Sequence, residues 1–401
     1  MSQGLRNINL PLGTRDIVYD EAALYTDIER RLTGVFSANG FREIRTPAIE
    51  YHDVYSYEQQ AIPEESMYKL TDNTGRLAVL RPDNTMPAAR VIATKLRKEP
   101  LPQKLYYNQS IYRINSGYSG RRSEIIQSGV ELIGAGGMTG DLICLSCAVE
   151  ALKALELPFK IEIGHVGYFN ALLDELDLTE EEKRQTRAFV DAKNSVSLNL
   201  SHRLASFDRI RRIPLLYGGE EVFAEAAELA AGNAKALEAL NHVSRLYRML
   251  VDAGYGDFVI VDMGIVHKID YYTGVVFGGY IEGAGEPVLN GGRYDNLLDH
   301  FGCQAPATGF AVNVCLVADA MLKNGRCAPL KNERRCVLHF TPDCFAEAEA
   351  YKKALSEKGY LCEYSCFDSF EDTLSYTRTR GIGHIARISK DGAELMEVNA
   401  I

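Results

Sequence analysis

Apolar residues recur at helical spacing near the start of the chain, over about residues 21–38. The residues that stand three or four positions apart there are Leu24, Ile28, Leu32, Val35 and Phe36. This spacing predicts an amphipathic helix. Asp20 can cap its first turn, and Gly40 can end it.

After this helix the pattern changes to the period-two alternation of half-buried strands. Strands or hairpins are predicted at 41–51, 67–81, 104–114, 124–134 and 159–167, with helices at 81–96 and 139–156. Pro47 interrupts the first of these strands, and proline in a strand indicates a sheet edge or a bulge. The hairpins, with helices not inserted regularly between strands, predict an antiparallel sheet in an α+β fold.

Two later segments complete the predicted organisation. From about 168 to 254 the strand pattern gives way to a helical one, which predicts a helical insertion in a main domain of residues 1–325. A polar linker, Arg326–Glu333, follows the main domain. Residues 334–401 then show a strand–helix–strand–helix–strand order, which predicts a small α/β domain with a parallel sheet.

The composition narrows the class of protein. The 401 residues carry a net charge of −10, which argues against a dominant nucleic-acid surface, so no nucleic-acid partner is expected. No run of 18 apolar residues and no apolar signal core occur, so neither a membrane span nor secretion is expected. The nine scattered cysteines suit reduced thiols, and we expect a cytoplasmic protein.

Several familiar chemistries are missing from the sequence. It contains no P-loop, no His-Glu-x-x-His and no Gly-x-Ser-x-Gly. Cys144 and Cys147 stand in a predicted helix without a second pair, and two packed thiols are a better interpretation than a zinc or redox site. No metal, cofactor or catalytic residue is therefore predicted.

Two polar segments near residues 271 and 291 could form the floor of a ligand site. Tyr271 and Tyr272 are predicted on a strand, and Gly291-Gly292-Arg293 as a turn that brings backbone close to a ligand. Two core aromatic residues and a plain turn explain the same residues without a ligand.

A second candidate site lies on the predicted strand 124–134. Gln127, Gly129 and Glu131 share one face by period two, and the glycine would leave space for a ligand between the amide and the carboxylate. A solvated strand face is the commoner cause of this pattern.

Three arginines near glycines, Arg113, Arg121 and Arg122, could bind a carboxylate or phosphate. A solvent-exposed loop accounts for them equally well.

Taken in order, these segments resemble the catalytic domain of histidyl-tRNA synthetase, a class II aminoacyl-tRNA synthetase. The segments that resemble its motifs 1 and 2, its two histidine signatures and its motif 3 are FREIRTPAIEY, YRINSGYSGRRSEIIQSGVELIG, IDYYTGVVF, GGRYDNLL and TGFAVNVCLV. The resemblance covers about residues 8–320. It implies the class II synthetase-like antiparallel fold, a homodimer formed through the motif 1-like strand, and a shortened anticodon-binding domain at the C-terminus.

The departures from the family concern its ATP chemistry. The catalytic arginine of the first histidine signature corresponds to His267, and the phosphate-binding arginine of motif 3 corresponds to Leu316. Motif 2 keeps Arg113, but its Arg-x-Glu becomes Arg113-Ile114-Asn115. Loss of two arginines removes charge-assisted bonds to phosphate, so adenylation should be crippled.

The residues that bind the amino acid in the synthetase family are better matched in this sequence than those that bind ATP. The histidine-binding residues that the resemblance implies are Asp83, Thr85, Arg113, Gln127, Glu131, Tyr271 and Tyr272. A chain with a histidine pocket but without ATP chemistry resembles the regulatory subunits of ATP phosphoribosyltransferase. The segment LRPDNT, residues 80–85, also resembles those subunits.

This second resemblance implies a non-catalytic subunit with no cofactor. Its partner would be a short-form catalytic subunit, and it would act in the first step of histidine biosynthesis and in feedback control by histidine. The alternatives are an active histidyl-tRNA synthetase and a stand-alone histidine-binding module.

Overall fold

The structure, a computed structural model, describes residues 9–56, 62–115, 121–200, 208–265, 271–325 and 334–398. The chain divides into two compact units, Met1–Cys327 and Ala328–Ile401. The predicted linker, Arg326–Glu333, lies outside the described residues, and each unit is described below by itself.

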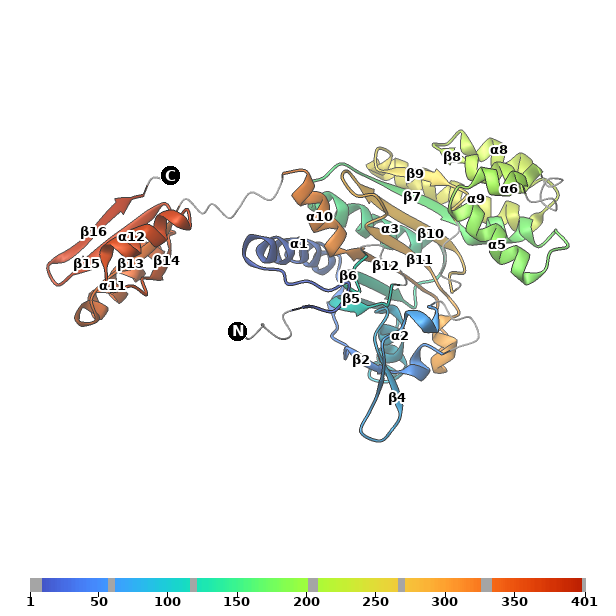
Figure 1. Cartoon of the computed structure of the whole chain (residues 1–401). Helices are drawn as coiled ribbons and strands as arrows, with labels where there is room; N and C mark the ends of the chain where they lie inside the picture. Colours follow the sequence, from blue (N-terminus) through green and yellow to red (C-terminus); the bar gives the residue numbers. More distant parts are fainter. Residues whose placement is uncertain are drawn as a thin grey trace, which may run out of the picture. The chain divides into compact units, whose positions relative to one another are not determined.

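A nine-stranded sheet forms the centre of the first unit (Figure 1). Its strands, in spatial order, are β1 (Arg42–Glu43), β5 (Gln103–Tyr112), β6 (Glu124–Ile133), β12 (Ala307–Asn313), β11 (Leu289–Arg293), β10 (Val275–Ile281), β7 (Phe159–His165), β9 (Val259–Asp262) and β8 (Tyr217–Gly218). Only the pairs β1–β5 and β7–β9 are parallel, and every other neighbouring pair is antiparallel. The predicted α+β class with an antiparallel sheet is confirmed.

Three helices pack on one face of this sheet: α1 (Tyr19–Ala38), α3 (Gly137–Ala154) and α10 (Val314–Lys323). The predicted apolar stripe of α1 is confirmed, because Ile28, Leu32 and Phe36 are fully buried in the main core. The predicted cap is wrong, since the N-cap residue is Val18 and it makes no side-chain cap bond. Asp20 instead lies in the first turn, where its charge favours the positive end of the helix dipole.

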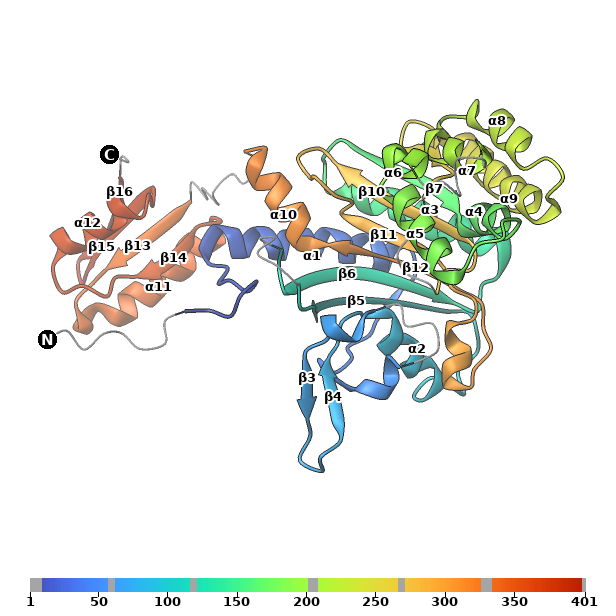
Figure 2. The same ribbon diagram turned by 45° about the vertical axis from the view of Figure 1, so that its right-hand side comes forward.

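Smaller elements lie against the opposite face of the sheet. They are α2 (Thr85–Ala93), the 3₁₀ helix η6 (Leu297–Phe301) and a three-stranded sheet of β2 (Ile49–Tyr51), β4 (Leu77–Leu80) and β3 (Lys69–Thr71). The β3–β4 hairpin projects from the body of the unit (Figure 2). The single strand predicted at 41–51 is wrong, because the chain leaves the large sheet after β1 and joins the small sheet at β2, with Pro47 between them.

The stretch between β7 and β9 is mostly helical. It contains α4 (Val166–Leu173), α5 (Glu180–Asp191), α6 (Ser195–Leu200), α7 (Asp208–Arg212), α8 (Val222–Leu229) and α9 (Ala234–Leu250). These helices gather at the end of the sheet that carries β7 and β9 (Figures 1 and 2). Helix α9 anchors the group, since its apolar face, including Val243 and Leu246, is buried in the main core.

Short helical turns complete the first unit, and one occurs in the second. They are η1 (His52–Val54), η2 (Glu64–Ser66), η4 (Ile213–Leu215), the π-helical η5 (Val251–Tyr255) and η7 (Pro342–Cys344). No helix in the described part of the chain combines the length and apolar character that crossing a membrane requires.

The second unit is a four-stranded sheet between two helices. Its elements are β13 (Arg335–His339), α11 (Phe345–Glu357), β14 (Leu361–Tyr364), α12 (Phe370–Thr379), β15 (His384–Ser389) and β16 (Gly392–Glu397). β13 pairs in parallel with β14 and β15, as predicted, but β16 adds an antiparallel edge strand that the sequence pattern did not indicate. Leu338 and Leu355 share a core on one face of the sheet, and Val337 and Ile385 share one on the other.

Candidate functional site

A cavity of about 970 Å³, here called the central pocket, opens on the sheet face opposite α1 and α3 and also reaches the start of α10. Its walls come from β5, β6, β11, β12, α2 and the segment before β10. All seven residues predicted to bind histidine line it: Asp83, Thr85, Arg113, Gln127, Glu131, Tyr271 and Tyr272. The pocket therefore brings together residues that lie up to 189 positions apart in the chain.

Two glycines, Gly309 in the lining of the central pocket and Gly129 on the neighbouring strand, lie against polar side chains of the site. A Cβ atom at Gly309 would lie 2.1 Å from Oε2 of Glu131, and one at Gly129 would lie 2.7 Å from the hydroxyl oxygen of Tyr107. The predicted open space above Gly129 is wrong, because the ring of Tyr107 occupies it. The glycines instead let these two polar side chains lie close against the sheet.

Glu131 is the most isolated charged group of the pocket. It is 2% exposed, and its Oε1 accepts hydrogen bonds from the hydroxyls of Thr85 (2.9 Å) and Tyr107 (3.3 Å), while Oε2 accepts one from Tyr294. No lysine or arginine in the described part of the chain pairs with it. Burial therefore raises the pKa of the Glu131 carboxyl to about 7, although the three hydroxyls act in the opposite direction.

Asp83 lies at the start of α2 and is fully buried. Its Oδ1 accepts a hydrogen bond from the backbone N–H of Met86 at 3.1 Å, which satisfies one of the free donors of the first helical turn. Burial raises the pKa of the Asp83 carboxyl, and Arg113 nearby partly offsets this. Asp83 thus fixes the position of α2, and with it Thr85, at the pocket wall.

Asn84 adds a polar group that the sequence prediction did not include among the binding residues. Its Nδ2 donates to Oε1 of Gln127 at 3.1 Å and to the backbone carbonyl of Gln109 at 3.4 Å. Its Oδ1 has no hydrogen-bond partner within the residues that the structure describes, although the side chain is only 2% exposed. A buried acceptor without a donor costs about 1–3 kcal/mol, so a donor from a ligand would be favoured here.

The three predicted arginines do not form one anion site. Nη2 of Arg122 donates to both carboxylate oxygens of Asp319 (2.6 and 2.8 Å), and Nη1 donates to the hydroxyl of Tyr25 at 2.7 Å, which ties Arg122 to α10 and α1. Arg113 lines the pocket and donates through Nε to the carbonyl of Pro82 at 2.8 Å. Arg121 is exposed at the rim. Arg113 is therefore the best-placed cation for a ligand anion.

Two predicted local structures are wrong. Tyr271 and Tyr272 precede β10 rather than lying on a strand, and their rings meet edge to face with centroids 5.0 Å apart. Gly291 to Arg293 belong to β11 rather than to a turn. The ring of Tyr272 packs where a Cβ of Gly292 would stand, so glycine is needed in that strand.

Arg293 does not face the central pocket. It is 5% exposed and forms ion pairs with Asp141 (2.7 Å) and Asp295 (2.9 Å). It also donates to the carbonyls of Ala135 and Gly137. These contacts fix the end of β11, and so the position of Tyr294, the next residue.

The remaining predictions concern the ATP end of the site and the cysteines. Leu316, at the start of α10, lines the central pocket where the resemblance places a phosphate-binding arginine. His267 lies outside the described residues. Cys144 and Cys147 are buried thiols of α3, and the described residues contain no group of three side chains suited to holding a metal ion.

Known proteins of one family are similar to this chain over most of its length. The family model of histidyl-tRNA synthetases matches residues 13–317. The chain is 38% identical to the ATP phosphoribosyltransferase regulatory subunit of Clostridium botulinum (strain 657) over 393 residues, with 96% of this chain and 93% of that protein covered. It is 39% identical to the protein of the same name from Clostridium acetobutylicum over 401 residues, with 97% of each chain covered.

Solved structures are similar over most of the chain. The crystal structure of an ATP phosphoribosyltransferase regulatory subunit/histidyl-tRNA synthetase from Bacillus halodurans has a TM-score of 0.80 and 32% identity, and covers 92% of this chain and 96% of that one. A histidyl-tRNA synthetase from Nostoc shares the fold, with a TM-score of 0.79 at 18% identity over 98% of this chain and 95% of that one.

The raised pKa of Glu131 predicts a pH dependence of stability. Because its pKa rises from about 4.5 unfolded to about 7 folded, the folded state binds the proton more tightly, and stability falls as pH increases through this window. We compare the free energy of unfolding in urea of wild type with that of the Glu131→Gln variant. The difference between the two should decrease by about 3 kcal/mol from pH 4.5 to pH 7.5. A difference that stays constant over this range would show that Glu131 ionises normally.

Proposed function

The chain belongs to the ATP phosphoribosyltransferase regulatory subunits, within the histidyl-tRNA synthetase family, and we propose from this membership that it binds and activates a short catalytic subunit in the cytoplasm. That complex would transfer the phosphoribosyl group to ATP in the first step of histidine biosynthesis. In this proposal the chain itself performs no chemistry and acts by binding.

The ATP end of the central pocket supports a non-catalytic role. Leu316 offers no charge to a phosphate, and the guanidinium of Arg122 is already engaged by Asp319. Arg113 remains as the main cation for a nucleotide that carries close to four negative charges. Since charged donors at the reacting phosphate supply several kcal/mol of transition-state stabilisation, adenylation is not favoured here.

The observation that carries the ligand proposal is the buried Glu131 carboxyl. Its pKa of about 7 lies close to the ordinary imidazole value of about 6.5, so a histidine side chain against it would share one proton at neutral pH. Either the imidazolium donates to the carboxylate or the protonated carboxyl donates to the imidazole. The first arrangement gives the carboxylate a charge-assisted hydrogen bond, and the second lets the buried carboxyl stay neutral while its proton is bound.

The amine end of the ligand would meet Asn84. Oε1 of Gln127 already accepts from Asn84, whereas Oδ1 of Asn84 is unpartnered in the described residues and lies at the same wall. An ammonium donates three hydrogen bonds and accepts none, so it matches this acceptor. Arg113 is our candidate partner for the ligand carboxylate.

A homodimer is part of the proposal. Ile49 and Tyr51 on β2 are 56% and 40% exposed, and Leu77 on the paired strand β4 is 42% exposed. These apolar side chains belong to the motif 1-like segment and the strand beside it. Burying them against a second copy would remove an exposed apolar surface from water.

Reconstitution tests the activation directly. Mixing the chain with the short-form catalytic subunit of the same organism should yield a complex on size-exclusion chromatography and raise the rate of phosphoribosyl transfer to ATP at least about tenfold. Histidine-dependent ATP–pyrophosphate exchange is the control and should stay at background. Robust exchange would identify an active synthetase, and neither complex nor rate gain would identify a stand-alone binding module.

Histidine binding should depend on Glu131. Substitution Glu131→Ala removes a hydrogen bond to a charged or proton-sharing partner, worth about 1.5–3 kcal/mol, so the Kd for histidine should rise about 10- to 100-fold in calorimetric titration. Asp319→Asn, at the opposite end of the pocket, serves as the comparison and should change the Kd much less. Equal affinities of wild type and Glu131→Ala would refute this pocket as the histidine site.

The role of Asn84 can be separated with a ligand that lacks the ammonium. Asn84→Ala should weaken histidine binding about tenfold, because one charged hydrogen bond is lost, and should leave the affinity for imidazolepropionate nearly unchanged. Asn241→Ala, on the exposed face of α9, is the protein control. An equal loss for both ligands would mean that Asn84 shapes the pocket without contacting the amine.

A further inference from the structure

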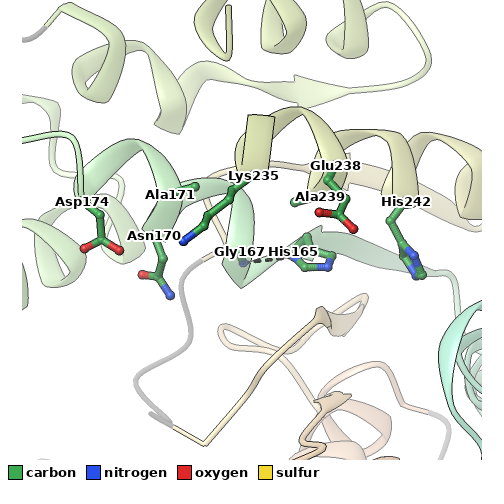
Figure 3. Close-up of a pocket in the computed structure, with 9 residues that line it drawn as sticks. All are labelled: His165, Gly167, Asn170, Ala171, Asp174, Lys235, Glu238, Ala239 and His242. Atoms are coloured by element: carbon green, nitrogen blue, oxygen red, sulfur yellow. Dashed lines mark hydrogen bonds between the residues drawn. The ribbon is translucent and has the colours of Figure 1, made fainter. Parts of the chain in front are cut away.

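A second cavity, here called the helix cavity, lies between α4, α9 and the end of β7 (Figure 3). Its volume is about 330 Å³, at the small end of the range for ligand sites. The residues that line it are His165, Gly167, Asn170, Ala171, Asp174, Lys235, Glu238, Ala239 and His242. None of them belongs to the central pocket.

The lining offers one available positive and one available negative charge. Lys235 and Glu238 lie one turn apart on α9, a spacing at which such residues often pair, but they form no ion pair with each other or with another described side chain. In Figure 3 the side chains of Lys235 and Glu238 extend from α9 toward the segment that contains His165 and Gly167. Asp174 contributes no net charge, because Lys183 binds it at 2.8 Å.

His165 supplies a hydrogen-bond donor between these charges. Its Nδ1 accepts from the backbone N–H of Gly167 at 3.0 Å, so in the neutral ring the proton is on Nε2. Burial lowers the pKa of His165 to about 4, which keeps the ring neutral at physiological pH. A neutral ring here donates one hydrogen bond without adding charge.

A chain of hydrogen bonds, one of them the buried ion pair of Asp141 with Arg293, connects the helix cavity to the central pocket. Nε2 of His242 donates to Oδ2 of Asp141 at 2.8 Å, and Oδ1 of Asp141 accepts from Nε of Arg293 at 2.8 Å. Asp141 and Arg293 are 2% and 5% exposed, so water screens these contacts little. The residue after Arg293 is Tyr294, whose hydroxyl donates to Glu131 in the central pocket.

We propose that the helix cavity is a second ligand site for a small zwitterion, an α-amino acid, with its carboxylate at Lys235 and its ammonium at Glu238. The chain His242–Asp141–Arg293–Tyr294 transmits its occupancy to Glu131. The binding part of this inference stands on the helix cavity alone. The coupling part rests on the proposed histidine site in the central pocket.

The binding part is tested in the full chain with the central pocket disabled by Glu131→Ala. Each of the standard L-amino acids is titrated by calorimetry. At least one should bind once per chain, and adding Lys235→Ala or Glu238→Ala, which removes one exposed ion pair to the ligand, should raise its Kd about three- to fivefold. Arg245→Ala, exposed on the same helix, is the matched control and should leave the Kd within twofold. No binding by any amino acid, or binding that ignores Lys235 and Glu238, overturns the site.

The coupling part is tested in the wild-type chain, which keeps Glu131. Saturation of the helix cavity with the amino acid found above should change the Kd for histidine in the central pocket at least about fivefold, and His242→Ala should abolish this change. Circular dichroism and the midpoint of urea unfolding verify that this variant is folded. A histidine Kd in wild type that does not change when the helix cavity is saturated overturns the coupling. This result leaves the proposed function intact, because that function depends on activation of the catalytic subunit.

Discussion

A carboxyl group buried without a cation is the constraint around which the centre of this protein is arranged. Three hydroxyls from α2, β5 and the end of β11 converge on Glu131, and Gly129 and Gly309 leave room for the Tyr107 and Glu131 side chains against the sheet. The carboxyl is therefore held in place but not neutralised. A group in this state gains most from a partner that brings its own proton, which is the physical basis of the proposed histidine site.

The same constraint explains why the neighbouring elements are so firmly fixed. Tyr294 reaches Glu131 only if the end of β11 keeps its place, and the ion pairs of Arg293 hold it there. Thr85 reaches it only if α2 starts at the right point, which the bond from Met86 to Asp83 secures. Structural residues and ligand residues of this pocket are thus adjacent in sequence but perform different tasks.

Local pattern was enough to predict the main elements. The apolar spacing of Ile28, Leu32 and Phe36 predicted α1, and period two placed Gln127 and Glu131 on one face of β6. The fold class followed from the order of strands and hairpins. The resemblance to a known family, rather than spacing, assembled the seven candidate residues around one pocket.

Local pattern failed where distant partners decide the structure. Arg293 looked like part of a turn because its partner Asp141 lies 152 positions earlier in the chain. Tyr107 and Tyr294 were missed at the site because each looks like an ordinary strand aromatic until Glu131 is placed beside it. Arg122 looked available for an anion because nothing in its own loop shows that it pairs with Asp319 on α10.

The pair of Arg122 with Asp319 also bears on the history of this site. An arginine restored at position 316 would stand one turn before Asp319 on α10 and would compete with Arg122 for that carboxylate. A phosphate could then bind a guanidinium only by breaking its ion pair with Asp319. Under the proposed non-catalytic function, a single Leu316→Arg reversion therefore meets a site in which Arg122 already occupies the Asp319 carboxylate.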